Sequence, residues 1–108
     1  MGTSSKRYEV LLTSAVKKDL KRLRSHKARI GEALGELETN PLAGHTLKGT
    51  WTGLRSLGFT VKGSGAFRAV YAVIDDEAVC LVIIVGPHEN IYEAAERRVE
   101  SLRAAGEL

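Results

Sequence analysis

The sequence predicts an α+β fold, a small and mostly antiparallel sheet of about four strands packed against an N-terminal α-hairpin, with one further helix at the C-terminus. Two observations predict it. Apolar residues recur at helical spacing in two neighbouring segments near the N-terminus and in one segment at the C-terminus. Between them, three strand-like segments are separated by short turns, as in antiparallel hairpins. The predicted order is therefore β-α-α-β-β-β-α, with the helices expected on one face of the sheet.

The N-terminal part is predicted to form a strand followed by two helices. Residues 7–13 alternate between polar and apolar and then run apolar, which is typical of a strand. Ser14 is a good N-cap for a helix over residues 15–25. A second helix is expected over residues 28–39, and Pro41 ends it because the residue before a proline is pushed out of the helical region.

The rest of the chain is predicted to form three strands and a closing helix. Residues 42–53 are polar and punctuated by glycine, which favours a loop. Strands are expected over residues 54–61, 67–74 and 79–85, joined by a glycine-rich turn and then by a short acidic one. Residues 89–102 again show helical spacing and should form the last helix.

The composition is that of an ordinary globular protein. The 108 residues predict one domain over residues 1–108, in which residues 1–6 are expected to be flexible. No apolar run approaches the length of a membrane span, so no membrane partner is expected. Cys80 is the only cysteine and lies in an apolar run, which predicts a buried, inert thiol. The expected location is the cytoplasm, where thiols stay reduced.

Charge is distributed unevenly along the chain. Residues 1–30 hold nine Lys or Arg and two acidic residues, a net charge of +7, whereas residues 71–108 hold three Arg and eight acidic residues, a net charge of −5. A basic face of this size attracts polyanions such as nucleic acid through phosphate contacts. The alternative is a solvated helix face without a partner.

Two places in the C-terminal half carry candidate functional residues. Arg68 begins a strand on a face that is otherwise apolar. Further on, Gly86 and Pro87 end the last strand directly before His88. If the helix begins at Pro87, His88 and Tyr92 are four positions apart and share a face. Imidazole titrates near neutrality, so His88 is a candidate for proton transfer.

The order of several fragments carries a family resemblance. The basic helix pair is followed by NPLAGHTLKG, GLRSL and AFRAVYAVIDDEAVCLVIIVG, and then by a polar group ending at Tyr92. This ordered set resembles the RelE/ParE superfamily, the toxins of type II toxin–antitoxin modules, from about residue 8 to residue 99. The superfamily contains ribosome-dependent mRNA endonucleases and also gyrase poisons without nuclease chemistry.

The nuclease branch implies roles for particular residues. Metal-independent cleavage, in which the ribose 2′-OH attacks its neighbouring phosphate, needs a proton acceptor, cations for the phosphate charge and an acid for the leaving oxygen. The resemblance implies that Arg68 clamps the phosphate, His88 transfers protons and Tyr92 orients the 2′-OH or stacks on a base. Arg55 matches a basic residue on the preceding strand, whereas Leu57 stands where some nucleases have another cation.

The resemblance also implies contacts with RNA. Lys48 matches a basic loop residue that contacts RNA backbone, and Lys62 can supply the cation missing at Leu57. The basic helix is expected to contact ribosomal RNA through Lys17, Lys18, Lys21 and Arg22. The implied partners are a cognate antitoxin, mRNA and the ribosome, with no cofactor and no metal.

Several alternatives remain open. The protein can instead inhibit DNA gyrase by binding, as ParE-like toxins do, or it can be a non-catalytic RNA-binding module. For single residues, Arg68 can form a structural ion pair, and Tyr92 can be a packing anchor for the last helix. His88 can be a helix-start residue at the sheet edge, and Lys48 can be solvated.

Overall fold

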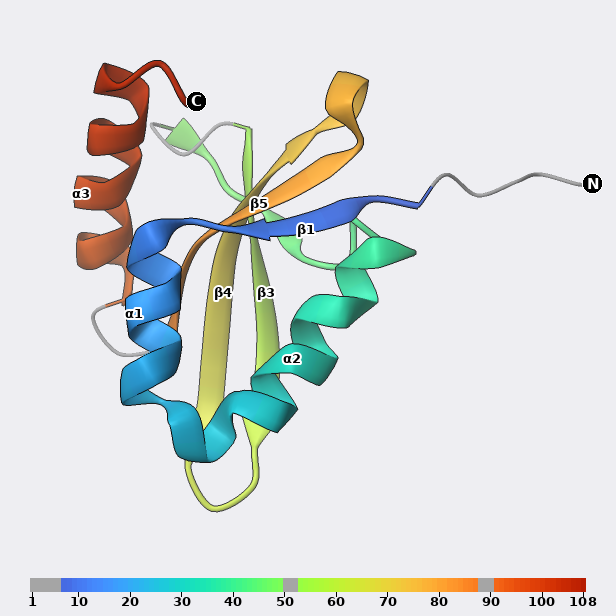
Figure 1. Cartoon of the computed structure of the whole chain (residues 1–108), viewed down its shortest axis with the longest axis vertical. Helices are drawn as coiled ribbons and strands as arrows, with labels where there is room; N and C mark the ends of the chain where they lie inside the picture. Colours follow the sequence, from blue (N-terminus) through green and yellow to red (C-terminus); the bar gives the residue numbers. More distant parts are fainter. Residues whose placement is uncertain (1–6, 50–52, 88–90) are drawn as a thin grey trace, which may run out of the picture.

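One mixed sheet organises the fold. The computed structural model describes residues 7–49, 53–87 and 91–108. Within them, five strands lie in the order β1-β5-β4-β3-β2 (Figure 1). The strands are β1 (Glu9–Leu12), β2 (His45–Thr46), β3 (Leu54–Val61), β4 (Gly65–Ile74) and β5 (Val79–Pro87). Only β1 runs parallel to its neighbour β5, and the other three pairs are antiparallel. The predicted α+β class and the three central strands are therefore confirmed.

The described part of the chain has one strand more than expected. Strand β2 lies in a segment that we expected to be entirely loop, and it pairs with Ser56 and Arg55 of β3. A strand of two residues has no alternating pattern, since both of its side chains are exposed. Backbone pairing with an existing edge creates this strand, so periodicity could not predict it.

The N-terminal hairpin consists of α1 (Ser14–Arg22) and α2 (Lys27–Gly35). A short 3₁₀ helix, η1 (Arg24–His26), lies between them, and a second, η2 (Glu36–Glu38), continues α2. The cap of α1 is Thr13 rather than Ser14, because the Thr13 Oγ1 accepts a hydrogen bond from the Val16 N–H at 3.2 Å. The 3₁₀ turns account for the expected helix ends at residues 25 and 39.

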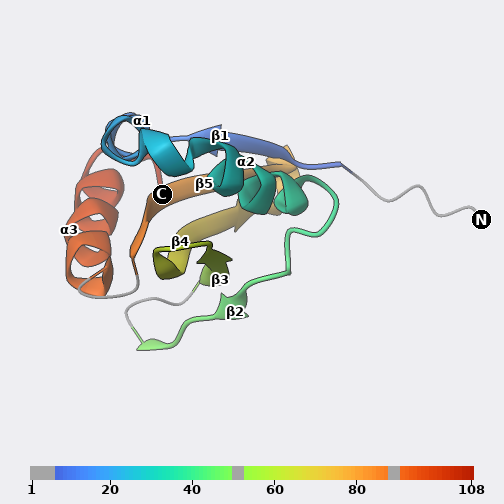
Figure 2. The ribbon, with the colours of Figure 1, turned by 90° about the horizontal axis from the view of Figure 1, so that it is seen from below.

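The helices cover both faces of the sheet, contrary to the expectation of a single covered face. A first core contains α1 and α2 residues such as Val16 and Ile30 packed with Tyr71 of β4. A second core joins α3 (Ile91–Ala104) to the opposite face through Ile91, Ala95 and Val99. Figure 2 shows β5 passing between α3 and α2. The error arose because amphipathic spacing shows which side of a helix is buried, but not which face of the sheet receives it.

Strand β5 contains an irregularity in its pairing with β4. Val70 pairs with Ile84 and Tyr71 with Val82, so Ile83 is an extra residue in β5. Nearby, Cys80 is fully buried, as expected, and burial is the main cause that raises the pKa of its thiol. Among the helices of the described ranges, none is long and apolar enough to cross a membrane.

Candidate active site

The candidate site begins with Arg68, which lies between two glycines on the α3 side of the sheet. Arg68 of β4 is directly opposite Gly58 of β3 and Gly86 of β5. A Cβ at Gly58 would lie 3.1 Å from the Arg68 Nη1, so the guanidinium lies over the backbone of β3. Glycine at this position permits the close approach, since any side chain would compete with the guanidinium for the same space.

The charge of Arg68 has no partner in residues 7–49, 53–87 or 91–108. No hydrogen bond or ion pair connects its half-buried side chain to any of these residues. The structural ion pair that we considered as an alternative is therefore not found in these ranges. A guanidinium presents several donors in one plane, a geometry that matches two oxygens of a phosphate. Arg68 is thus placed to bind an anion above the sheet.

Tyr92 contacts the same face of β3, at Ser56, two positions from the glycine that the Arg68 guanidinium covers. Its hydroxyl is 3.1 Å from the Oγ of Ser56, which is 1 % exposed, and its ring packs against the second core. Ser56 and Gly58 are two positions apart on one face of β3, about 7 Å along the strand backbone, so the phenol at Ser56 and the guanidinium over Gly58 occupy neighbouring positions of this face. One phosphodiester with its ribose can span this interval. Tyr92 is thus both the packing anchor that we considered and a polar group of the site.

Ser56 was missed in the sequence, although a signal was present. In the strand LRSLGFTV, Ser56 shares a face with Leu54, which is buried in the second core. A small polar residue on a buried strand face needs a hydrogen-bond partner, and here the partner is the Tyr92 hydroxyl. The partner lies 36 positions away in sequence, so the position of the serine alone could not identify it.

His88 lies outside the described residues. The described residues on either side of His88 are Pro87, the last residue of β5, and Ile91, the first residue of α3. Pro87 is paired with Phe67 in the sheet, so the helix does not begin at Pro87 as we supposed. Tyr92 lies in a helix that begins at Ile91, so a shared helical face with His88 is not supported, and the role of His88 stays a prediction.

Arg55 lies on the opposite face of the sheet from Arg68. It is paired with Tyr71, and its Nε donates to the Gly44 carbonyl at 3.1 Å. Tyr71 belongs to the first core; its hydroxyl accepts from the Gly44 N–H at 3.0 Å and donates to the Pro41 carbonyl at 2.7 Å. Arg55 and Tyr71 together hold the segment after α2 against the sheet. The structure therefore does not bring Arg55 to the other candidate residues.

The other basic residues lie in three separate segments. Lys48 follows β2, where the Leu47 N–H donates to the Leu54 carbonyl at the start of β3, and Lys62 follows Val61 at the end of β3. Both lysines are exposed and lie at opposite ends of β3, with the Arg68–Tyr92 site between them. The remaining predicted RNA contacts are exposed on α1: Lys17, Lys18, Lys21 and Arg22.

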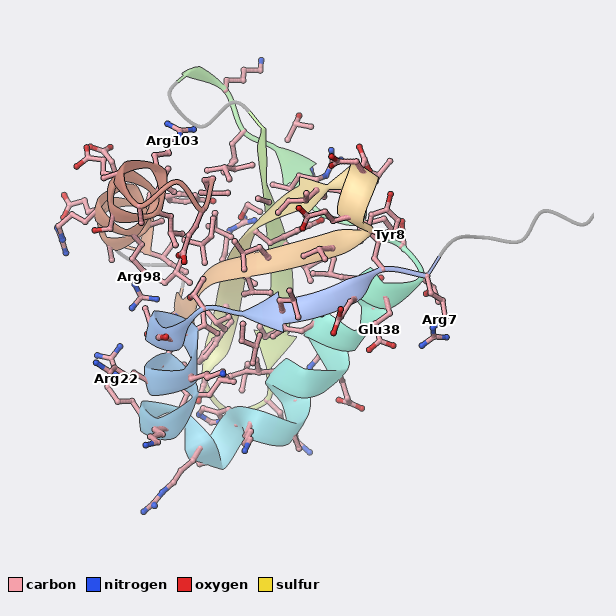
Figure 3. The ribbon with its side chains drawn as sticks, turned by 45° about the horizontal axis from the view of Figure 1, so that its top comes forward. Arg7, Tyr8, Arg22, Glu38, Arg98 and Arg103 are labelled. Atoms are coloured by element: carbon pink, nitrogen blue, oxygen red, sulfur yellow. The ribbon has the colours of Figure 1, made fainter. Side chains whose placement is uncertain are left out.

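Sequence reasoning also missed a buried ion pair that connects α1, β5 and α3. The Arg98 Nη1 and Nη2 donate to the two carboxylate oxygens of Asp19 at 2.7 and 2.8 Å. Arg22, labelled with Arg98 in Figure 3, donates to the same carboxylate from the solvent side. Asp19 is the one acidic residue in α1, and the local pattern of the sequence does not show that it is buried. Within the described ranges, no group of three or more His, Cys, Asp or Glu could hold a metal ion.

Comparison with known proteins agrees with this class of small α+β protein. Residues 10–96 match the family described as "ParE-like toxin of type II bacterial toxin-antitoxin system". The chain belongs to this family of ParE-like toxins, and thus to the RelE/ParE superfamily. Among curated proteins, no sequence matches the chain.

Solved structures show the same fold. A free mutant of the Escherichia coli toxin RelE is 24 % identical, covers 86 % of this chain and 98 % of its own, and has a TM-score of 0.67. The RelBE2 toxin–antitoxin complex from Mycobacterium tuberculosis is 23 % identical over 82 % of this chain and 100 % of its own, with a TM-score of 0.63. A mutant E. coli RelE in complex with a peptide of the antitoxin RelB is 25 % identical over 84 % and 94 %, with a TM-score of 0.62.

Proposed function

We propose that this toxin is a metal-independent endoribonuclease that cleaves mRNA on the ribosome and so stops translation. The observation that carries the proposal is the geometry of Arg68. Its guanidinium lies over Gly58, unpaired within the described ranges, and the Tyr92 hydroxyl contacts Ser56, two positions away on the same face of β3. A site that offers a cation and a phenol, but no cluster of metal ligands in those ranges, suits phosphate chemistry driven by positioning and charge.

Each residue has a distinct task in the proposed reaction. Arg68 binds the non-bridging oxygens of the scissile phosphate and stabilises the negative charge that grows there as the 2′-oxygen attacks. Tyr92, whose hydroxyl Ser56 holds at 3.1 Å, orients the ribose 2′-OH or stacks on the adjacent base. The 2′ proton passes to His88, and a proton returns to the leaving 5′-oxygen. The 2′-oxygen thereby forms a bond to phosphorus as the bond to the 5′-oxygen breaks.

Two sets of basic residues serve the RNA. Lys48 and Lys62 stand at the two ends of β3, so an RNA strand that follows β3 meets one cation before the Arg68–Tyr92 site and one after it. Leu57 is buried in the first core and adds no cation to this face. The exposed basic residues of α1 lie on a different part of the surface and are assigned to ribosomal RNA, where phosphate contacts supply affinity without sequence preference.

A cognate antitoxin is the proposed partner that holds the toxin inactive. Two of the similar structures are described as complexes of a toxin with an antitoxin or an antitoxin peptide. An antitoxin segment that is extended in the complex and acidic would suit the net charge of +7 in residues 1–30. Co-purification of the two proteins from a strain that expresses both genes tests this partnership.

The second candidate function is inhibition of DNA gyrase by binding, because the family that matches the chain is named ParE-like. The two functions differ in what they damage. A nuclease leaves new mRNA 5′ ends inside translated codons, whereas a gyrase poison causes DNA breaks and leaves mRNA intact.

The decisive experiment is induced expression of the toxin with mapping of mRNA 5′ ends. Cleavage within translated codons is expected for the unmodified protein, and Arg68→Ala should slow it by about 100- to 1000-fold, the cost of removing one group that stabilises transition-state charge. Arg97→Ala is the matched control, since Arg97 is an exposed arginine of α3 outside the site. Undiminished growth arrest by Arg68→Ala, or DNA breaks without mRNA cleavage, contradicts the proposal.

A further inference from the structure

Helix α3 carries Tyr92, so the position of this helix decides where the phenol lies. Its buried residues Ile91, Ala95 and Val99 form an apolar stripe against the second core. Apolar burial is strong but not directional, because it depends on the area removed from water rather than on a fixed geometry. The stripe therefore decides which side of α3 faces the sheet, but within the width of the stripe it leaves the finer rotation of the helix about its own axis to the polar contacts at its edges.

Two polar contacts lie on opposite sides of this stripe. Tyr92 and Arg98 are six residues apart, which places them about 120° apart around a helix of 3.6 residues per turn, with the stripe between them. On one side, the Tyr92 hydroxyl meets Ser56 of β3. On the other side, Arg98 meets Asp19 of α1 and the carbonyl of Ile83 in β5. The two contacts together define one rotation of α3.

The Arg98 contact is the stronger and more directional of the two. Both of its terminal nitrogens bind the Asp19 carboxylate, at 2.7 and 2.8 Å, and Nη1 also donates to the Ile83 carbonyl at 3.0 Å. A guanidinium that donates two parallel hydrogen bonds to one carboxylate has little freedom to turn. The Asp19 side chain is 2 % exposed and the Arg98 side chain 22 %, so water screens the pair only slightly.

The backbone of β5 supplies a fixed point for this contact. The pairing of β1 with β5 ends at Val82, and the extra residue Ile83 follows directly. Beyond this point the Ile83 carbonyl and the Val85 N–H are bound by side chains, the first by Arg98 and the second by Asp19. The next residue, Gly86, is paired with Arg68. The ion pair is thus attached to β5 immediately before Gly86, the residue paired with Arg68 in the sheet.

We propose that Arg98, held by Asp19 and the Ile83 carbonyl, is a positioning residue that sets the rotation of α3 and thereby places the Tyr92 hydroxyl at Ser56, on the face of the sheet that carries Arg68. Arg98 does not touch RNA in this arrangement. It acts through Tyr92, and its effect on cleavage rests on the proposed nuclease function. Its effect on the position of Tyr92 is independent of any activity.

The test therefore has one measurement with RNA and one without it. The chain has three tyrosines, Tyr8, Tyr71 and Tyr92, so ¹³C labelling of tyrosine rings gives a simple NMR spectrum in which Tyr92→Phe assigns the Tyr92 signal. Arg98→Met should move the Tyr92 signal toward its position in Ser56→Ala, whereas the signal of the buried Tyr71 stays in place and reports an intact core. Arg97→Met is the matched control and should change neither signal.

The measurement with RNA separates positioning from binding. At saturating ribosomes, Arg98→Met should lower kcat by about 10- to 100-fold, the effect of a small misplacement of a reacting group, with KM nearly unchanged. Arg98→Lys keeps the charge but cannot make the two parallel hydrogen bonds to the Asp19 carboxylate. It should give an intermediate kcat and an intermediate shift of the Tyr92 signal. If Arg98→Met does not fold, Arg98→Lys and Asp19→Asn decide by the same two measurements.

The outcomes distinguish this inference from the proposed function. An unshifted Tyr92 signal in a folded Arg98→Met variant overturns the inference, as does an unchanged kcat in that variant. If the unmodified protein cleaves no mRNA but Arg98→Met shifts the Tyr92 signal, the nuclease proposal fails and the positioning of Tyr92 by Arg98 is supported.

Discussion

Asp19 and Arg98, 79 positions apart in the sequence, form a two-bonded ion pair that connects the first helix of the protein to the last. The pair also satisfies two backbone groups of β5, since Asp19 accepts from the Val85 N–H and Arg98 donates to the Ile83 carbonyl. Replacing a complete buried pair by apolar residues is often neutral, but removing one partner leaves an uncompensated charge. Removing one partner of the pair should therefore cost more stability than replacing both partners together.

Asp19→Ala should be strongly destabilising. The change leaves the Arg98 guanidinium, only 22 % exposed, without its carboxylate, and it removes the acceptor of the Val85 N–H. The expected loss is about 3 kcal/mol in the free energy of unfolding, as for other half-broken buried pairs. Urea unfolding measures it. The control is Glu32→Ala, which removes an exposed pair with Arg29 and should cost less than about 0.5 kcal/mol. Equal losses for the two variants would contradict this interpretation.

Gly58→Ala should impair the site while leaving the fold largely intact. The added methyl would lie 3.1 Å from the Arg68 Nη1, closer than ordinary contact, so the guanidinium must shift by a few tenths of an ångström away from β3. Because a long side chain can shift, we expect a change of less than about 1 kcal/mol in the free energy of unfolding. Cleavage should fall by about 10- to 100-fold, since the phosphate-binding group is displaced. Gly31→Ala is the matched control, because a Cβ there meets nothing within 4 Å. Thermal unfolding together with a cleavage assay separates the two effects.

The sequence could predict the parts of this protein that depend on local patterns. Strand β4 shows why: Phe67, Ala69 and Tyr71 belong to the first core and Val70 to the second, as the alternation predicted. The same alternation placed Arg68 on an otherwise apolar face, where the structure has it. Period and composition are local properties, so they can be read without knowing the fold.

The relationships between distant segments could not be predicted in this way. The burial of Asp19 depends on β5 and α3 packing around it. The family resemblance assigns Arg55 to the same site as Arg68, because Arg55 matches a basic residue on the preceding strand. In the register of β3 and β4, however, Arg55 is opposite Tyr71, whereas Arg68 is opposite Gly58. Because Arg55 and Gly58 are three positions apart on β3, their side-chain positions lie on opposite faces of the sheet, and so do the two arginines. The pairing register of a strand, and with it the face on which each side chain lies, is set by the whole sheet.

The Cys80 thiol should be inert in the folded protein. It is fully buried, and burial, followed by the charge of Asp75, raises the pKa of the thiol, so very little reactive thiolate forms near neutral pH. We expect a thiol-reactive dye to label the native protein far more slowly than the protein in denaturing urea. Because Cys80 is the only cysteine, the signal has one source, and Cys80→Ala supplies the blank. Labelling at equal rates in both states would show that the first core opens readily.

Stability at high pH should depend on Tyr71. Burial is the main cause that raises the pKa of its hydroxyl above 10.0 in the folded protein, although the Gly44 N–H and Arg55 lower it in part. A raised pKa for an acidic group means that folding favours its neutral form. The contribution of Tyr71 to stability is therefore complete below the pKa of the unfolded chain, near 10, and is lost as the pH rises through the higher folded value.

Tyr71→Phe tests this dependence directly. The variant loses the hydrogen bonds with the Gly44 N–H and the Pro41 carbonyl, so it should be less stable by about 1–3 kcal/mol near neutral pH. Between pH 9 and 12 its free energy of unfolding should fall less steeply than that of the unmodified protein, because one buried tyrosine no longer ionises on unfolding. Denaturant unfolding across this pH range, with Tyr92→Phe for comparison, measures both effects. Parallel pH curves for Tyr71→Phe and the unmodified protein would show that Tyr71 does not control alkaline unfolding.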